Sequence, residues 1–445
     1  MGRVGLIGEN SIEYVNILLD IWNSGDCAVI IDWRIPYQTA LKMMKEASVK
    51  KCYIAKKVLE KVLKEKLYDV EFISFDKNSN SAELLPDHIY DKFKDNYSRE
   101  ESIVLYSSGT TGKAKGIILS HYAINTNAEA IIDYMRPTKE DCIYIAKTLS
   151  HSSTLTGELL VALKTRMKLV ITPVIVPPRY VLNNIIKFGV SIICLNPTML
   201  SAYAEEFRLK KYNWLPLQKI YVSGSVLTDK IYNFVHEIFK NIAIYNVYGL
   251  SEASPRITAQ RAECCKTNSV GKPIKGVDIV IVDDNGNIVE RGEFGIIHVN
   301  TPSRFDGYIS CNEKHTSIYQ DWLNTGDVGY LDENDELHIV DRIDDVIIID
   351  SHKIYPSDIE KQITKNTSIS ECIVLKLENK GNEFIGCLYA GKNEIENNIK
   401  DRLNQVLIFY EIPRFFLKCD TLPHTMNGKI SVQDAKDLIT KIFET

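Results

Sequence analysis

The 445-residue sequence lacks the features of a membrane or secreted protein. No stretch approaches the roughly 18 uninterrupted apolar residues that a transmembrane helix needs. The first ten residues contain glycine and an acidic residue and lack the apolar core of a signal peptide. N-myristoylation requires serine or threonine at position 6, where this sequence has Leu6. These absences predict a cytoplasmic protein with no membrane span.

A strong charge of either sign is also missing. Lysine and arginine number 53 against 58 acidic residues, which gives a net charge of -5 and an isoelectric point near 6.1. The basic stretches have acids close by, as in Lys64–Lys66, and this mixing predicts solvated faces. The composition therefore gives no support for a surface that binds nucleic acid or membrane.

The ten cysteines form no Cys-x-x-Cys pair. Several lie inside apolar runs such as Ile192–Leu195, and this placement predicts buried free thiols of a reducing compartment. The adjacent Cys264 and Cys265 are a candidate redox pair, but their polar flanks and the lack of a partner motif favour plain thiols.

The first 240 or so residues alternate β-rich runs with amphipathic segments. Val4–Ile7, Cys27–Ile31 and Lys168–Ile171 have the apolar character of buried strands, and residues 39–47 show helical spacing. Strands that alternate with helices are typical of an α/β domain with largely parallel sheets.

The pattern changes from about residue 270, where Gly295–Val299 and Tyr330–Val340 indicate antiparallel strands and hairpins. We therefore expect a large α/β domain over residues 1–342, β-rich from about 270 to 342, and a small mobile α+β domain over residues 343–445. The small domain is expected to contain the strands Glu371–Leu377 and Glu383–Ala390 and the helices Pro356–Thr364 and Glu396–Leu407.

The run from Tyr106 to Gly116 holds three glycines, two lysines and four serine or threonine hydroxyls between two apolar runs. Glycines let backbone N–H groups converge on an anion, hydroxyls add donors, and lysine adds positive charge. The run therefore predicts a polyphosphate-binding loop between two strands. Its glycine spacing differs from that of a Walker A motif. The flanking core strands make a flexible linker the weaker interpretation.

Four further motifs follow this loop in a fixed order. They are Tyr245–Glu252, Asn324–Tyr330, Asp341–Asp345 leading to Ile354–Pro356, and Leu422–Ile430. Together with Ser107–Gly116 they resemble the adenylate-forming (AMP-binding) superfamily, which includes acyl- and aryl-CoA ligases, adenylation domains of peptide synthetases, and luciferases. The resemblance runs from about residue 2 to residue 440 and rests on the order of all five motifs.

The resemblance implies catalytic roles for Lys429, Glu252, Thr111 and His151. Lys429 would bridge the substrate carboxylate and the α-phosphate of ATP, and Glu252 would hold Mg²⁺, which prefers carboxylate oxygen. Tyr248 would lie along the adenine. The residues implied in nucleotide binding are Ser107, Ser108, Gly109, Thr110, Thr111, Gly112, Lys115, Ser223, Gly224, Ser225, Asn246, Tyr248, Gly249, Ser251, Asp327, Ile339, Arg342 and Lys429.

Several of these residues also have plainer interpretations. Asp327, implied in holding the ribose hydroxyls, would by itself be a turn residue. Arg342, implied in ribose or phosphate contact, would by itself be a surface ion-pair partner. Lys429 would by itself be a solvated lysine after a turn. Asp344 matches the hinge residue of the family, and a plain surface turn explains its charged segment equally well.

The segment Thr148–Ser153 resembles the part of the family that lines the acyl pocket. His151 is therefore a candidate gate beside the carboxylate, with a structural histidine as the alternative. Amino-acid-activating members place an aspartate just after this point, whereas Ser152–Thr154 stand here. A buried ammonium without a carboxylate partner is costly, so a fatty, aryl or other simple acid is favoured. Ser223–Ser225 would line the opposite wall.

Three features depart from the family pattern. Ala114 replaces a common proline in the phosphate loop. Ser351 stands where a glycine usually lets the pantetheine arm approach the backbone, which puts the thioester step in question. The chain also begins where the family has a few dozen more residues, so we expect a compact variant or a different edge to the large domain.

The residues and the resemblance together predict ATP-dependent activation of a carboxylic acid to an acyl-adenylate with release of pyrophosphate. Mg²⁺ would be the metal, and the thiol of CoA or of a phosphopantetheine carrier protein would accept the acyl group. The alternatives are adenylation alone or transfer to an amine or hydroxyl. An amino-acid adenylation enzyme and a non-catalytic nucleotide-binding scaffold are less favoured.

Overall fold

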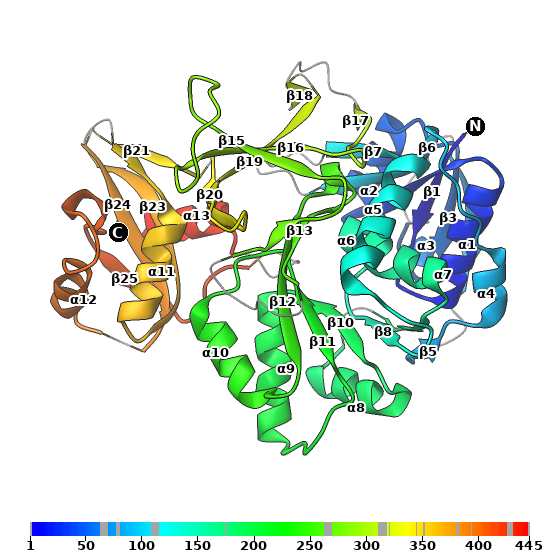
Figure 1. The fold of residues 1–445 in the computed structure, drawn as a ribbon, viewed down its shortest axis with the longest axis horizontal. Helices are drawn as coiled ribbons and strands as arrows, with labels where there is room; N and C mark the ends of the chain where they lie inside the picture. The colour runs from blue at the N-terminus through cyan, green and yellow to red at the C-terminus, as the bar shows by residue number, and fades with distance from the viewer. Residues whose placement is uncertain are drawn as a thin grey trace. The chain divides into compact units, whose positions relative to one another are not determined.

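The computed structural model describes residues 2–62, 70–76, 81–107, 115–173, 176–261, 269–309, 318–319, 321–343, 345–349, 352–379, 382–392, 394–424 and 430–443. The chain forms two compact units (Figure 1). The first unit comprises Met1–Gly224, Val235–Ile279 and His298–Thr325, and the second comprises Ser225–Phe234, Val280–Ile297 and Gly326–Thr445. The boundary expected at residues 342/343 stays a prediction.

The first unit contains a seven-stranded sheet. Its strands, in spatial order, are β17 (Gly307–Ile309), β7 (Lys115–Ser120), β6 (Glu101–Ser107), β2 (Cys27–Ile31), β1 (Arg3–Ile7), β3 (Lys51–Ala55) and β4 (Glu71–Phe75). The strands from β6 to β4 run parallel, whereas β7 is antiparallel to both of its neighbours. Every residue of β2 is buried, as expected for a parallel strand covered on both faces.

Five helices follow the strands of this sheet along the chain. The first begins where the hydroxyl of Ser11 accepts a hydrogen bond from the backbone N–H of Tyr14 at 3.1 Å, which is a typical N-cap. The side chains of Leu41 and Met44 in the second helix pack in one core cluster with Val29 of β2. The helices are α1 (Ile12–Asn23), α2 (Tyr37–Glu46), α3 (Lys56–Val62), α4 (Asp87–Lys92) and α5 (His121–Met135).

A second sheet of eight strands completes the first unit. Its strands, in spatial order, are β14 (Lys272–Pro273), β13 (Arg256–Ala259), β12 (Ala243–Gly249), β11 (Lys219–Val222), β10 (Ile192–Leu195), β8 (Cys142–Ile145), β9 (Lys168–Ile171) and β5 (Glu83–Leu84). The strands from β12 to β9 run parallel. The helical segments between these strands along the chain are α6 (Ser152–Thr154), the π-helical turn Leu155–Leu160, α7 (Val161–Thr165), α8 (Pro178–Phe188), α9 (Pro197–Leu209) and α10 (Asp229–Ile238), whose first residues belong to the second unit.

An antiparallel sheet follows in the chain, where the sequence predicted β-rich structure. Its order is β15 (Asp278–Val282), β16 (Gly295–Asn300), β19 (Trp322–Leu331) and β18 (Ile318–Tyr319), and β20 (Leu337–Arg342) pairs with β19. The β19–β20 hairpin sets Asp327 opposite Arg342 and Tyr330 opposite His338. This register positions two of the residues implied in nucleotide binding.

The C-terminal part of the second unit is an α+β fold. Alternate residues of its longest strand point to opposite faces, so Cys372 and Val374 join one core cluster and Ile373 and Leu375 join another. The first cluster includes Ile359 of the preceding helix. The elements are β21 (Ile347–Ile349), β22 (His352–Ile354), α11 (Pro356–Asn366), β23 (Ile369–Asn379), β24 (Asn382–Gly391), α12 (Glu396–Leu403), β25 (Phe416–Lys418) and α13 (Val432–Phe443).

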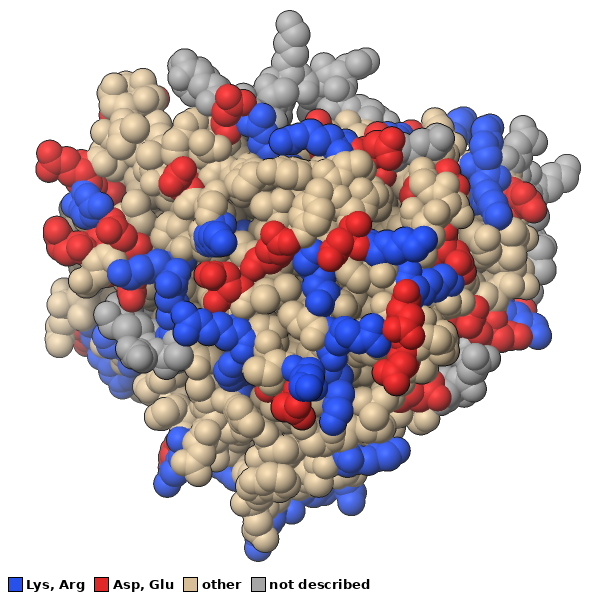
Figure 2. Space-filling model, turned by 45° about the vertical axis from the view of Figure 1, so that its right-hand side comes forward, with Lys and Arg blue, Asp and Glu red and all other residues tan. Residues whose placement is uncertain are grey.

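The expected α/β class, with a β-rich part and a C-terminal α+β part, is thereby confirmed, and the mobility of the C-terminal part stays a prediction. Throughout the described ranges, every helix is too short or too polar to cross a membrane. The described cysteines are free thiols, and all but Cys419 are buried. On the face shown in Figure 2, basic and acidic side chains are interspersed, which agrees with the mixed surface expected from the composition.

Close packing between β1 and β3 leads to a stability prediction. A Cβ atom at Gly5 would lie 2.8 Å from Sγ of Cys52, closer than atoms pack, whereas a Cβ at Gly157 would meet its neighbours at 3.7 Å. We expect Gly5→Ala to lower the free energy of unfolding by about 1–3 kcal/mol through overpacking. Gly157→Ala, inside a helical stretch, should be neutral or stabilising. Equal unfolding midpoints of the two variants in urea would contradict this account.

Candidate active site

Two neighbouring parallel strands of the second sheet, β11 and β12, bring predicted residues to one edge. The carboxyl ends of parallel strands meet at the same edge, which is where α/β proteins bind ligands. Ser223 follows β11, and its N–H donates to the carbonyl of Leu195 at 3.0 Å. Gly224 has φ +95°, a conformation that favours glycine. Asn246 lies opposite the last residue of β11, and its amide donates to the carbonyl of Ser269 at 3.1 Å.

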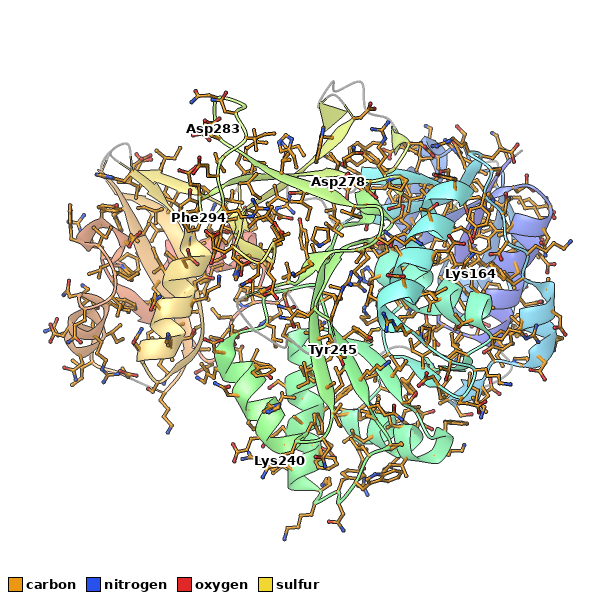
Figure 3. The ribbon with its side chains drawn as sticks, viewed as in Figure 1. Lys164, Lys240, Tyr245, Asp278, Asp283 and Phe294 are labelled. Atoms are coloured by element: carbon orange, nitrogen blue, oxygen red, sulfur yellow. The ribbon has the colours of Figure 1, made fainter. Side chains whose placement is uncertain are left out.

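The motif Tyr245–Glu252, here called the adenine motif because Tyr248 is expected to lie along the adenine, begins in the core and ends at a tight turn. Tyr245, labelled in Figure 3, is buried and stacks on the ring of Tyr221 with centroids 5.1 Å apart. A Cβ atom at Gly249 would lie only 1.9 Å from the carbonyl oxygen of Pro255, so this position has no room for a side chain. The N–H of Leu250 donates to the same oxygen at 2.9 Å. The close approach folds the chain back and presents the residues that follow.

Ser251 and Glu252 lie in that returning turn. The hydroxyl oxygen of Ser251 is 3.0 Å from that of Ser152, so the adenine motif contacts the predicted acyl-pocket segment. The backbone carbonyl of Glu252 accepts a hydrogen bond from the N–H of Phe305 at 2.8 Å. This bond fixes the backbone of the half-buried Glu252.

Tyr308 connects the predicted metal ligand to the end of the phosphate loop. Its hydroxyl donates to Oε1 of Glu252 at 2.9 Å, and Nζ of Lys115 lies 5.4 Å from the centroid of its ring. The pairing of β17 with β7 sets Tyr308 opposite Ile117 and thereby fixes the ring beside Lys115. Sequence reasoning missed Tyr308, because an isolated tyrosine after a glycine has no motif that would mark it.

The phosphate loop itself falls outside the described residues at Ser108, Gly109, Thr110, Thr111, Gly112 and Ala114, and the side chain of Ser107 is not described either. The two ends of the loop are described. The run lies between two strands, as expected, and these strands are direct neighbours, because Ser107 pairs with Lys115 in the antiparallel ladder of β6 and β7. The roles implied for these residues stay predictions.

The acyl-pocket segment is tied to the first sheet. The hydroxyl of Ser150 donates to Oδ2 of Asp32 at 2.9 Å, and the N–H of Leu149 donates to Oδ1 of Asn10 at 2.9 Å. Burial alone would raise the pKa of Asp32, but hydrogen bonds from Arg34 and Ser150 hold it below its usual value. Half-buried His151 directly follows this braced segment, and its gating role stays a prediction.

A buried carboxyl group, that of Glu158, lies seven residues after His151 in the chain. Glu158, in the π-helical turn, is fully buried, and Nζ of Lys147 lies 3.2 Å from its Oε1. Burial raises the pKa of Glu158 to about 7, and the nearby charge of Lys147 offsets this only in part. Nothing in the sequence marked Glu158, since a glutamate in a helical stretch is usually exposed.

In the second unit, two residues implied in ribose contact form an ion pair. Nη1 of Arg342 lies 3.3 Å from Oδ1 of buried Asp327. The neighbouring Asp341 accepts hydrogen bonds from the N–H of Arg342 at 2.8 Å and from the N–H of Ser357 at 2.9 Å, and burial raises its pKa. Ile339 is half-buried on the same strand, opposite Gly329.

Ser225 also belongs to the second unit. Half-buried Tyr248 lies in the first unit, on β12. Asp344, Ser351 and Lys429 fall outside the described residues, so the implied hinge, the departure from glycine and the catalytic lysine stay predictions.

The family described as AMP-binding enzyme matches residues 2–309. The chain belongs to this family. It is 28% identical to a long-chain-fatty-acid–CoA ligase of Yersinia pestis, over 78% of this chain and 63% of the ligase. It is 23% identical to 4-coumarate–CoA ligase 4 of Arabidopsis thaliana, over 77% of this chain and 63% of that enzyme. The matches thus cover less than two thirds of the length of these two relatives.

Other relatives match over most of their length. A 2-succinylbenzoate–CoA ligase of Bacillus mycoides is 26% identical over 99% of this chain and 89% of its own. The fold resembles that of ATP-bound MatB from Rhodopseudomonas palustris, with a TM-score of 0.84 and 21% identity over 99% of this chain and 89% of MatB. It also resembles MenE from Bacillus subtilis in complex with ATP and magnesium, with a TM-score of 0.80 and 24% identity over 98% of this chain and 89% of MenE.

The buried Glu158 leads to a prediction about pH. The unfolded chain releases its proton near the ordinary pKa of 4.5, whereas the folded chain holds it to about 7. The folded state therefore binds more protons across this window, and the free energy of unfolding falls as pH rises through it. Glu158→Gln removes this titration, so the variant should gain stability relative to the natural protein between pH 4.5 and 7, by on the order of 3 kcal/mol.

Urea unfolding of both proteins at a series of pH values from 5 to 8 measures this difference. Glu237→Gln, an exposed substitution on α10, is the control and should run parallel to the natural protein. A difference between Glu158→Gln and the natural protein that stays constant with pH would show that Glu158 is ionised throughout.

Proposed function

We propose that this protein is an acid–thiol ligase that forms an acyl-adenylate from ATP and a carboxylic acid and then transfers the acyl group to a thiol. The observation that carries the proposal is the junction at Tyr308, which contacts both Glu252 and Lys115. A carboxylate and a cation that both contact one side chain suit a complex of a metal ion and a polyphosphate. Membership of the AMP-binding enzyme family supports the same reaction.

The adenylation step brings two anions together. An oxygen of the substrate carboxylate attacks the α-phosphorus of ATP, the bond from that phosphorus to the bridging oxygen breaks, and pyrophosphate leaves with the electron pair. Repulsion between the anions is severe in a low dielectric, so the protein must supply positive charge where negative charge gathers. Lys115 supplies it at the phosphate loop, and Lys429 is proposed to supply it at the attacking carboxylate.

Glu252 suits Mg²⁺. Tyr308 bonds Oε1 of its carboxylate, and the second oxygen of a carboxylate can ligate a hard cation. Bound there, Mg²⁺ would neutralise charge on the phosphates of ATP. The hydrogen bond from Tyr308 fixes the orientation of the carboxylate before ATP arrives, which lowers the cost of forming the metal site.

The second step needs a thiol. Its sulfur, after losing a proton, attacks the acyl carbon, and the bond from that carbon to the oxygen of AMP breaks. CoA is the favoured acceptor, because the relatives named above are CoA ligases. A carrier protein and an amine or hydroxyl acceptor are the alternatives. Residues 343–445, with Asp344 as hinge, are proposed to act as the lid that delivers Lys429.

The acid is proposed to lack an α-ammonium group. The positions where amino-acid-activating members place an aspartate hold neutral side chains here, and Ser152 and Thr154 are buried. A buried ammonium would find no carboxylate in that segment. The relatives' printed substrates, which are a long-chain fatty acid, 4-coumarate and 2-succinylbenzoate, agree with such an acid. The free thiols of the described cysteines support a cytoplasmic location.

The decisive assay measures pyrophosphate release across a panel of fatty, aryl, dicarboxylic and amino acids. At least one acid without an α-ammonium should give turnover, and Lys429→Ala should lower it about a hundredfold or more, in the range seen when a charge-stabilising group is removed. Lys418→Ala, at an exposed position on β25, is the matched control. Turnover unchanged in Lys429→Ala, or none with any acid, would overturn the proposal.

The acceptor is tested in the same assay by adding CoA or a phosphopantetheinylated carrier protein to an active acid. CoA should accelerate the release of AMP and give an acyl-CoA. Acceleration by the carrier alone would assign the carrier as acceptor. Release of free acyl-adenylate that neither thiol accelerates would indicate that the protein stops at the adenylate. Ser351→Gly would then be the first variant to test for recovery of the thioester step.

Tyr308→Phe tests the junction. The substitution keeps the ring beside Lys115 and removes the hydrogen bond to Glu252, a bond to a charged group. We expect about a tenfold loss of kcat/KM for MgATP and a higher Mg²⁺ concentration for half-maximal activity. Tyr212→Phe is the matched control, because it removes a surface hydrogen bond to Asn183. A loss of the same size in both variants would mean that the bond to Glu252 has no special role.

A further inference from the structure

A cluster of metal-ligating side chains lies at the tip of the β19–β20 hairpin, apart from the residues assigned to the reaction. It consists of Asp332, Glu336 and His338, here called the hairpin cluster. Each residue offers a ligand atom, and these atoms all lie within 4.8 Å of one another. All three belong to the second unit and follow the part of the chain that matches the family, residues 2–309.

The turn of the hairpin aims Asp332 at His338. Oδ1 of Asp332 accepts hydrogen bonds from the N–H groups of Asn334 at 2.8 Å and of Glu336 at 2.9 Å. The backbone therefore curls around one carboxylate oxygen. The other oxygen, Oδ2, lies 3.1 Å from Nε2 of His338. Two ligand atoms bound tetrahedrally at about 2.0–2.1 Å from one Zn²⁺ lie about 3.3 Å apart, close to this separation.

The imidazole of His338 is held in place. Its ring stacks on that of Tyr330, with centroids 4.5 Å apart and planes within 4°. Tyr330 in turn packs edge-on against Phe294, labelled in Figure 3, at 5.1 Å. A ligand whose ring is fixed by its neighbours loses little conformational freedom when a metal binds, which favours binding.

The charges of the hairpin cluster call for a cation. Glu336 and His338 are only 5% and 6% exposed, so water screens the two nearby carboxylates poorly. The guanidinium of Arg291 binds Asp335 at the outside of the turn. A divalent ion between the three side chains would balance the two carboxylates.

We propose that the hairpin cluster binds a divalent transition-metal ion, Zn²⁺ foremost, which fastens the β19–β20 hairpin. The imidazole nitrogen favours Zn²⁺ over Mg²⁺ or Ca²⁺, which take oxygen ligands. The ion has a structural role, because the same two strands carry Asp327 and Arg342 opposite each other. An ion bound at the tip of the hairpin would stabilise the register of β19 and β20. This role does not depend on which reaction the protein catalyses.

The test is calorimetric titration of the metal-stripped full chain with ZnCl₂ in the absence of nucleotide, with Co²⁺ as a spectroscopic probe of nitrogen and oxygen ligation. We expect one ion per chain. His338→Gln and Glu336→Gln, two near-isosteric variants, should each weaken binding at least tenfold. His424→Gln is the matched control: its imidazole pairs with Glu371 at 2.8 Å outside the hairpin cluster, so it should bind as the natural protein does.

The same proteins are compared by thermal unfolding with and without Zn²⁺. Binding should raise the unfolding temperature of the natural protein and of His424→Gln more than that of the two cluster variants. No stoichiometric binding, or equal binding by all four proteins, would overturn the proposal. Either result would leave Asp332 and His338 as a simple hydrogen-bonded pair.

Discussion

The hydrogen bond from Tyr308 to Glu252 joins parts of the chain that the sequence keeps far apart. Tyr308 is on the edge strand β17, and Glu252 follows β12 of the other sheet. The same strand pairs with β7, which begins at Lys115. One tyrosine therefore holds the end of the phosphate loop and the returning turn of the second sheet in a single arrangement. The geometry of the candidate active site within the first unit depends on this contact.

Much of the fold could be predicted from the sequence because its patterns are local. Buried parallel strands appear as short apolar runs, so Val4–Ile7 and Cys27–Ile31 match β1 and β2 closely. The expected strands Glu371–Leu377 and Glu383–Ala390 lie inside the longer β23 and β24. The helix expected over Glu396–Leu407 ends at Leu403, because helix ends depend on capping contacts that periodicity does not reveal.

The parts of the site that sequence reasoning missed depend on contacts between distant residues. Tyr308 bonds Glu252, which lies 56 positions earlier in the chain, and Ser150 bonds Asp32, which lies 118 positions earlier. Glu158 is unusual only because the fold buries it beside Lys147. Neither composition nor periodicity records such pairs. The motifs that carry glycines and charges could be identified in the sequence, because their residues lie close together along the chain; the roles implied for them stay predictions.

Asp341 accepts hydrogen bonds from residues on either side of Asp344, from the N–H of Arg342 and from the N–H of Ser357 at the start of α11. The two bonds tie the end of β20 to the first turn of α11 through one carboxylate. A movement at the hinge proposed at Asp344 would have to break the bond to Ser357, since its donor follows Asp344 in the chain. That bond would therefore act as a latch, adding to the free energy that such a movement requires.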